Sequence, residues 1–179
     1  YKLREGVPAA SWSPIGNYNF STCSISSLEP TIAAIGTDEG SLLLYDITNH
    51  RKSIPFYSFN RRHRGSITGV AFSPTNNKLL ASTSEDGILQ FFDKESGTLV
   101  EQLPRVTSGI SAFSLNSDGI SCAVGTMAGQ VLLYDLRQSE SVVASLQVHD
   151  SVKRVRFSPP PKNKDSSTPA TLSKVIQSN

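Results

Sequence analysis

The chain has 179 residues, of which 37% are hydrophobic and 18% are charged, so it has enough apolar residues for one domain with a packed core. Lys and Arg number 17 and Asp and Glu number 15, a balance of +2 that does not indicate a generally basic nucleic-acid-binding protein. No apolar run reaches the roughly 18 residues of a membrane-spanning helix, so we expect no membrane partner.

The two cysteines, Cys23 and Cys122, are far apart and lack the spacing of a metal site. They therefore support neither a disulfide framework nor zinc binding, and a reducing, cytoplasmic location is expected. Residues 1–19 begin with Tyr1 rather than Met and include Trp12. We interpret them as the end of an earlier structural unit or a connecting segment, in a chain expected to be part of a longer polypeptide.

Residues 20–158 consist of short apolar runs separated by turn residues such as Asp86-Gly87, without an amphipathic helical pattern. This pattern predicts an all-β fold. Each unit is expected to contain four strands: 20–26, 31–36, 41–46 and 54–59; then 67–73, 79–84, 88–93 and 99–103; then 110–115, 121–126, 131–135 and 142–147.

The units repeat with a constant hairpin glycine. Gly40, Gly87 and Gly129 lie 47 and 42 residues apart, and each is followed by an apolar strand that ends in an aromatic residue and Asp. Four strands in a period of about 40 to 45 residues indicate the blades of a β-propeller. The chain would supply three antiparallel blades, and residues 152–158 would supply the first strand of a fourth.

A propeller closes with about four to eight blades, so the missing blades are expected from the rest of a longer polypeptide or from another chain. Residues 159–170 begin with three prolines and are otherwise polar, which predicts a loop. Residues 171–179 fit the next strand, although the start of a helix is the alternative.

These repeats resemble those of the WD-repeat β-propeller family, and the second unit resembles them best. In that family a His before the first strand, a Ser on the second, an Asp in the hairpin turn and a Trp on the third form a buried hydrogen-bond chain. The matching positions here are His63, Ser82, Asp86 and Phe92. Because Phe92 carries no hydrogen-bonding group, the resemblance implies only a partial chain.

A catalytic site is not indicated. His63 and His149 occupy the same place in the repeat, which favours a structural role, and no paired carboxylates or nucleophile motif accompany them. We therefore expect no enzyme activity, no cofactor and no metal. A propeller enzyme is the less favoured alternative, since it would need a cluster of charged residues at the inner-strand positions, and we expect none there.

Basic residues are concentrated in the segments that lead into first strands. Arg61, Arg62 and Arg64 are the first candidates for binding a partner, and a second set consists of Arg105, Arg137, Lys153 and Arg154. We expect these residues to gather on one rim of the propeller. They are either solvated loop charges or a surface for an acidic protein; nucleic acid is not expected, because no stacking aromatics lie among them.

Within the WD-repeat class, the segments 63–78 and 125–137 resemble most the adaptor family that attaches the γ-tubulin ring complex to centrosomes, spindles and microtubules. The resemblance implies a non-catalytic scaffold that supports microtubule nucleation. Its expected partners are the γ-tubulin complex or centrosomal and spindle proteins, and its expected location is the cytoskeleton at the centrosome or spindle pole. The alternatives are WD-repeat subunits of other assemblies, such as a ubiquitin ligase substrate receptor or a ribosome biogenesis factor.

Overall fold

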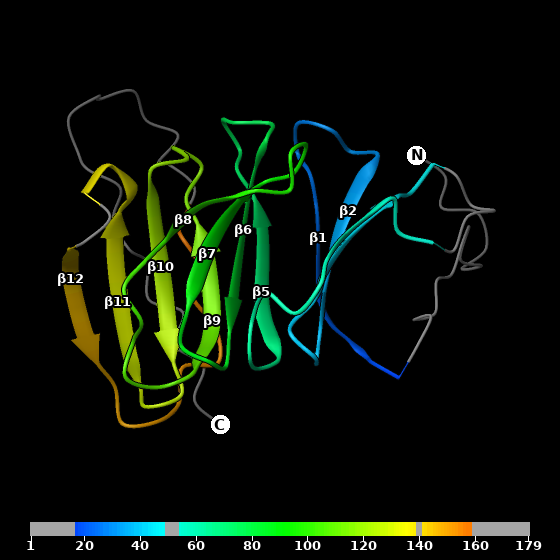
Figure 1. Cartoon of the computed structure of the whole chain (residues 1–179). Coiled ribbons are helices and arrows are strands. Elements are labelled where there is room, and N and C mark those ends of the chain that lie inside the picture. Colours follow the sequence, from blue (N-terminus) through cyan, green and yellow to red (C-terminus); the bar gives the residue numbers. More distant parts are fainter. Residues whose placement is uncertain (1–16, 49–53, 139–140, 159–179) are drawn as a thin grey trace, which may run out of the picture.

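Twelve strands form the framework of the residues that the computed structural model describes, which are 17–48, 54–138 and 141–158 (Figure 1). A single short 3-10 helix, η1 (Leu136–Gln138), occurs among the described residues. In chain order the strands are β1 (Phe20–Ile25), β2 (Ile32–Thr37), β3 (Leu42–Asp46), β4 (Tyr57–Phe59), β5 (Ile67–Phe72), β6 (Leu79–Ser84), β7 (Leu89–Asp93), β8 (Leu99–Gln102), β9 (Ile110–Leu115), β10 (Ser121–Thr126), β11 (Gln130–Asp135) and β12 (Val142–Gln147).

The strands form three separate antiparallel sheets of four, β1–β4, β5–β8 and β9–β12, which we call the first, second and third blades. The predicted all-β class and the four-stranded repeat are therefore confirmed. The fourth strand of the first blade was predicted too long, since β4 pairs with β3 only over Tyr57–Phe59. Ile54 and Phe56, just before it, are exposed at the outer edge of the sheet.

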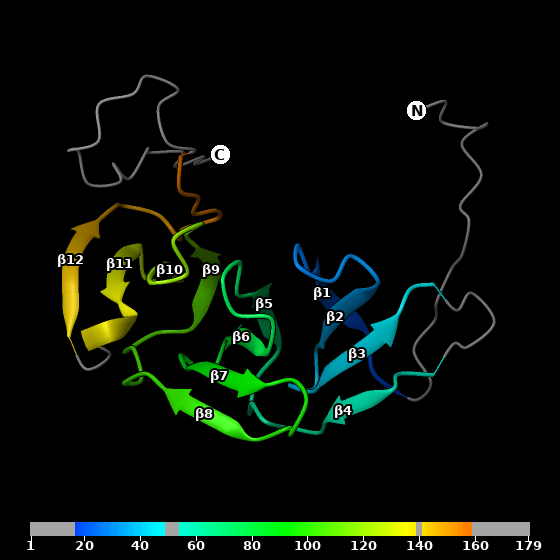
Figure 2. The ribbon, with the colours of Figure 1, turned by 90° about the horizontal axis from the view of Figure 1, so that it is seen from above.

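The three blades stand side by side around an arc (Figure 2). The strands β1, β5 and β9 line the inner side of the arc and contact one another in sequence, while β4, β8 and β12 lie on the outer side. The strand directions give the arc two rims. The entry rim, as we call it, carries the turns β2–β3, β6–β7 and β10–β11 together with the connections that lead into β5 and β9. We call the opposite rim the far rim.

Apolar cores form between neighbouring blades. Leu42 and Phe59 of the first blade pack with Val70, Leu80 and Phe92 of the second. A second core joins the other face of the second blade to the third. Because a middle blade is covered on both faces, its central strands are buried almost without alternation: β6 is buried over its last five residues and β7 over its first four.

The hairpin glycines are required by both backbone conformation and packing. Gly40, Gly87 and Gly129 have φ values of 80°, 80° and 82°, which side-chain-bearing residues rarely adopt. A Cβ atom on Gly40 would lie only 2.3 Å from the carbonyl oxygen of His63. The turn of the first blade is therefore pressed against the connection that leads into the second.

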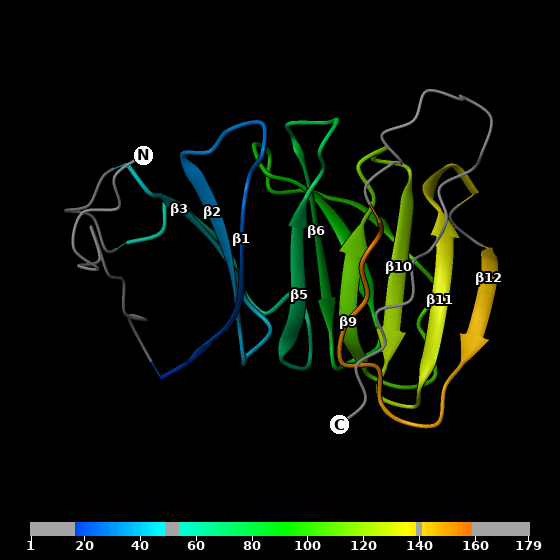
Figure 3. The same ribbon diagram turned by 180° about the vertical axis from the view of Figure 1, so that it is seen from behind.

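Residues 152–158, predicted as the first strand of a fourth blade, have no strand assignment. They run beside β9 on the inner side of the arc (Figure 3), with Val152 and Val155 buried against the third blade. No second strand of a further blade lies among the described residues, so this segment has no ladder to join. The expectations for residues 1–16 and 159–179 lie outside the described residues.

Candidate functional site

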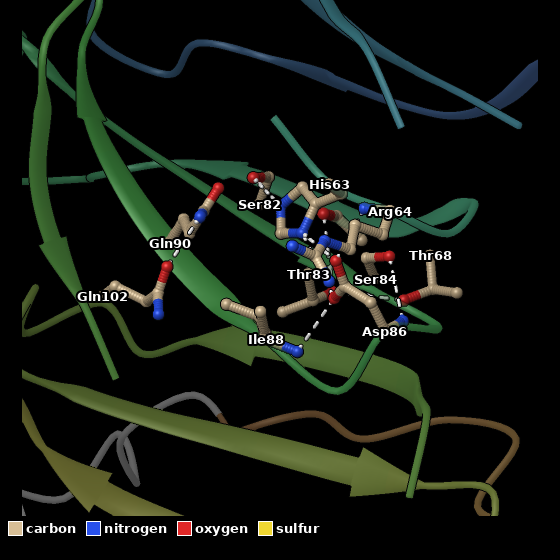
Figure 4. A network of polar contacts seen from close by, with 11 residues as sticks. His63, Arg64, Thr68, Ser82, Thr83, Ser84, Asp86, Ile88, Gln90 and Gln102 are labelled. Atoms are coloured by element: carbon tan, nitrogen blue, oxygen red, sulfur yellow. Dashed lines mark hydrogen bonds and ion pairs between the residues drawn. The ribbon is translucent and has the colours of Figure 1, made fainter. Parts of the chain in front are cut away.

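A buried polar cluster joins the entry to the second blade to its hairpin turn (Figure 4). His63 lies in the connection between β4 and β5, and its side chain is fully buried. Its Nε2 is 2.8 Å from the Ser82 hydroxyl on β6, and its Nδ1 is 3.2 Å from an Asp86 carboxylate oxygen. The structure thus brings together the three residues that the sequence proposed as a hydrogen-bond set.

The protonation of this cluster follows from its contacts. Burial lowers the pKa of His63, and the Asp86 carboxylate opposes that shift without overcoming it, so the ring is neutral near pH 7. A carboxylate only accepts hydrogen bonds, and therefore Nδ1 donates to Asp86 while Nε2 accepts from the hydroxyl of Ser82. All three groups are thereby satisfied, which is the arrangement of a structural histidine.

Asp86 also fixes the local backbone. One carboxylate oxygen accepts the backbone N–H of Ile88 at 3.0 Å, and the other accepts that of Arg64 at 2.9 Å. Phe92 takes the place of the family tryptophan and packs its ring 5.0 Å from that of Phe59 in the neighbouring blade. At this position an apolar contact between two blades therefore replaces the hydrogen bond that the tryptophan makes in the family.

The three arginines around His63 project from this anchored loop on the entry rim. Arg61, Arg62 and Arg64 are all exposed. The backbone N–H of Arg61 donates to the Ser41 hydroxyl at 3.0 Å, and its guanidinium lies 3.5 Å from the exposed Glu39 carboxylate. Since an exposed pair of this kind contributes little stability, the arginine side chains remain available to a partner. Arg105 is exposed in the β8–β9 connection on the same rim.

Arg137 does not belong to this surface. The expectation that the basic candidates gather on one rim of the propeller is therefore wrong for Arg137. It follows β11, and that strand runs from the entry rim to the far rim. Its guanidinium is paired with Asp135, with Nε 2.9 Å from Oδ1 and Nη2 2.5 Å from Oδ2. The pair lowers the pKa of Asp135 to about 2, so the charge of Arg137 is balanced locally.

Lys153 and Arg154 lie elsewhere again. Together with Arg156 they border a hollow of about 310 Å³ whose other walls come from β5 and β9. These two strands lie on the inner side of the arc (Figure 2). Charged side chains therefore do stand at a first-strand position, contrary to the expectation that inner-strand positions carry none. Within the described residues, no group of three or more His, Cys, Asp and Glu side chains could hold a metal ion.

One polar contact between blades was not foreseen. On the far rim the ammonium group of Lys94, from the second blade, pairs with the Glu29 carboxylate of the first blade. The Asn77 side chain joins them by donating to Glu29 at 2.6 Å. No local pattern signals this cluster, because Lys94 and Glu29 are separated by 65 residues and meet only when the blades stack.

This chain matches two protein families and is similar to curated relatives, two of which are described here. Residues 55–93 match the family described as "WD domain, G-beta repeat", and residues 101–177 match "Nucleolar protein 10-like, N-terminal domain". Protein NEDD1 of Homo sapiens is 30% identical over 122 residues, which are 68% of this chain and 18% of that protein. Ribosome biogenesis protein ENP2 of Chaetomium thermophilum is 32% identical over 75 residues, or 42% of this chain and 11% of that protein.

A solved structure supports the fold. A chain in the crystal structure of the mitotic checkpoint complex superimposes with a TM-score of 0.70 at 19% sequence identity, covering 79% of this chain and 41% of that chain. At this identity the likeness concerns the fold alone. The chain spans less than a fifth of the two curated relatives described above. Among the described residues, no helix is long and apolar enough to cross a membrane.

Proposed function

The chain belongs to the WD-repeat β-propeller class, and from this premise we propose that it is a non-catalytic adaptor that targets the γ-tubulin ring complex to centrosomes and the spindle. Two observations on the sequence support the proposal. One is the resemblance of residues 63–78 and 125–137 to the γ-tubulin adaptor family, and the other is the similarity to NEDD1. No cofactor enters this function.

The observation that carries a binding role is the arginine loop on the entry rim. Its centre, His63, is anchored by two side-chain contacts, while Arg61, Arg62 and Arg64 around it extend into solvent. An anchored loop loses little conformational freedom on binding. Exposed guanidinium groups can make paired hydrogen bonds to carboxylates, so this surface suits an acidic protein partner.

The test replaces Arg61, Arg62 and Arg64 by Glu in the full protein and follows its localisation and the partners it captures. We expect loss of localisation to microtubule-organising centres with unchanged thermal stability, because no buried group is altered. Arg137→Glu is the matched control, since it reverses an arginine on the far rim. Unchanged localisation and partners in the triple variant would show that the loop carries only solvated charge.

A ribosome biogenesis factor is the second candidate function. It is favoured by the match of residues 101–177 to the nucleolar protein 10-like family and by the similarity to ENP2. The same tagged protein distinguishes the two candidates. Accumulation in the nucleolus with pre-ribosomal proteins would support ribosome biogenesis, whereas accumulation at spindle poles with γ-tubulin would support the adaptor.

A further inference from the structure

The segment 152–157 follows the inner wall in the same way as a first strand. In the first blade the hydroxyl of Ser21 donates to the carbonyl oxygen of Ile67 at 2.6 Å, and Ser111 makes the same bond to Val152, also at 2.6 Å. A Cβ atom on Gly36 would collide with Ile67, just as one on Gly125 would collide with Val152. Val152 is therefore the structural equivalent of Ile67.

This equivalence identifies three unusual residues. The second, third and fifth positions of the first strands are small in every described blade. They are occupied by Ser21, Thr22 and Ser24; by Thr68, Gly69 and Ala71; and by Ser111, Ala112 and Ser114. The same positions in the segment 152–157 are Lys153, Arg154 and Arg156. Because small residues meet the packing requirement elsewhere, the fold does not explain three cations here.

The backbone that carries the cations is well anchored. Val152 and Val155 are buried in the apolar cluster with Ala112, Ala123 and Val131. The backbone N–H of Val152 also donates to the carbonyl oxygen of Thr126 at 3.1 Å. With the valines turned inward, Lys153, Arg154 and Arg156 are exposed in the same short segment, where their like charges repel one another.

The surroundings leave these charges without compensation. The hollow of about 310 Å³ that they border is otherwise lined by Thr68, Ser111, Ala112, Phe113, Ser114 and Val155, none of which is acidic. No ion pair in the described part of the chain involves the three cations. A hollow with fixed positive charge and no acidic wall attracts anions.

We propose that this inner-wall hollow binds the carboxylate side chains of an acidic segment of a protein partner. Two guanidinium groups and one ammonium group suit several closely spaced carboxylates, because each guanidinium can pair with a carboxylate through two hydrogen bonds. A protein segment is favoured over nucleic acid, because only one aromatic residue, Phe113, lines the hollow and base stacking would need more. This site is separate from the arginine loop and does not depend on the γ-tubulin assignment.

The test measures binding of a fluorescent hexaglutamate peptide to the full protein, with hexaglutamine as the neutral control. The variant Lys153→Ser, Arg154→Ala, Arg156→Ser installs the residues of the third blade at the equivalent positions, so it is expected to fold. It should weaken hexaglutamate binding by about tenfold or more. Arg137→Glu, on the far rim, should leave the affinity unchanged.

The binding position is tested by a hexaglutamate that carries a photoreactive benzophenone. Crosslinks to residues 111–114 or 153–157 would support the proposal. Crosslinks confined to residues 60–64, or an unchanged affinity in the triple variant Lys153→Ser, Arg154→Ala, Arg156→Ser, would overturn it. Tighter, variant-sensitive binding of oligouridylate than of hexaglutamate would also overturn it and indicate nucleic acid.

Discussion

Lys94 of the second blade and Glu29 of the first form an ion pair across the boundary between the two blades. The Lys94 side chain is 5% exposed and that of Glu29 is 37% exposed, so the ammonium group of this pair is buried. Asn77 completes the cluster by accepting from Lys94 at 3.3 Å. These contacts fasten the far rim, while the apolar core between the blades lies along the strands.

Replacing Lys94 by Ala should destabilise the protein by about 1–3 kcal/mol, because the Glu29 carboxylate and the Asn77 carbonyl then lose their buried donor. Lys78→Ala is the matched control. Its ammonium pairs with Glu95 at 2.7 Å, but both side chains are more than half exposed. Chemical denaturation of the full protein measures both changes; equal losses would show that burial of Lys94 adds nothing.

The Lys94 pair should also make stability depend on pH. The hydrogen bond from Lys94 lowers the pKa of Glu29 below its usual 4.5. The stabilisation is therefore complete above pH 4.5 and is lost as the pH falls through the lower pKa of the folded state. Comparing unfolding of the wild-type protein and Lys94→Met between pH 3 and pH 7 tests this, since the difference between them should shrink as the solution is acidified.

His63 should make the stability depend on pH in a second range, at higher pH than the Lys94–Glu29 pair. Burial lowers the pKa of its ring below the usual 6.5, so the unfolded chain binds a proton more readily than the folded protein. The free energy of unfolding should therefore fall as the pH decreases below 6.5, until the folded state also takes up the proton. In a nuclear magnetic resonance titration, the His63 ring should take up its proton only at a pH below 6.5, and a ring that is protonated at or above that pH would contradict the prediction.

Asp86→Ala should destabilise the protein by about 1–3 kcal/mol, because the His63 ring and the backbone N–H groups of Arg64 and Ile88 lose their acceptor. The neighbouring Glu85 is exposed and provides the control, since Glu85→Ala should change stability by less than about 0.5 kcal/mol. Thermal or denaturant unfolding distinguishes the two variants. If Asp86→Ala left the stability unchanged, the buried cluster would contribute nothing to the stability of the fold.

Gly36→Ala should destabilise the contact between the first two blades by about 1–3 kcal/mol, through overpacking. The new methyl group would lie 2.5 Å from Cγ2 of Ile67 and 2.9 Å from Cγ2 of Thr22. Because Ile67→Ala removes the nearest of these atoms, the double variant should lose less stability than the sum of the two single losses. Simple additivity in a double-mutant cycle would contradict the predicted clash.

The repeat and most of the strands could be predicted from the sequence. The spacing of Gly40, Gly87 and Gly129 located the hairpin turns, and the apolar runs before and after these glycines located β6, β9, β10 and β12 at their observed bounds. This was possible because turn chemistry and strand patterning are local properties of a few adjacent residues. The family resemblance also identified His63, Ser82 and Asp86 as one hydrogen-bond set, because these three residues match positions that are defined within a single WD repeat.

Tertiary structure alone decided which of the basic residues share a surface. Arg61, Arg62, Arg64 and Arg105 lie on the entry rim, whereas Arg137 lies on the far rim and Lys153 and Arg154 border the inner-wall hollow. Nor could the pairing of Lys94 with Glu29 be read from residues so far apart. Neighbours across a blade boundary are set by how whole sheets stack and in which direction each strand runs, and that packing is a property of the assembled blades.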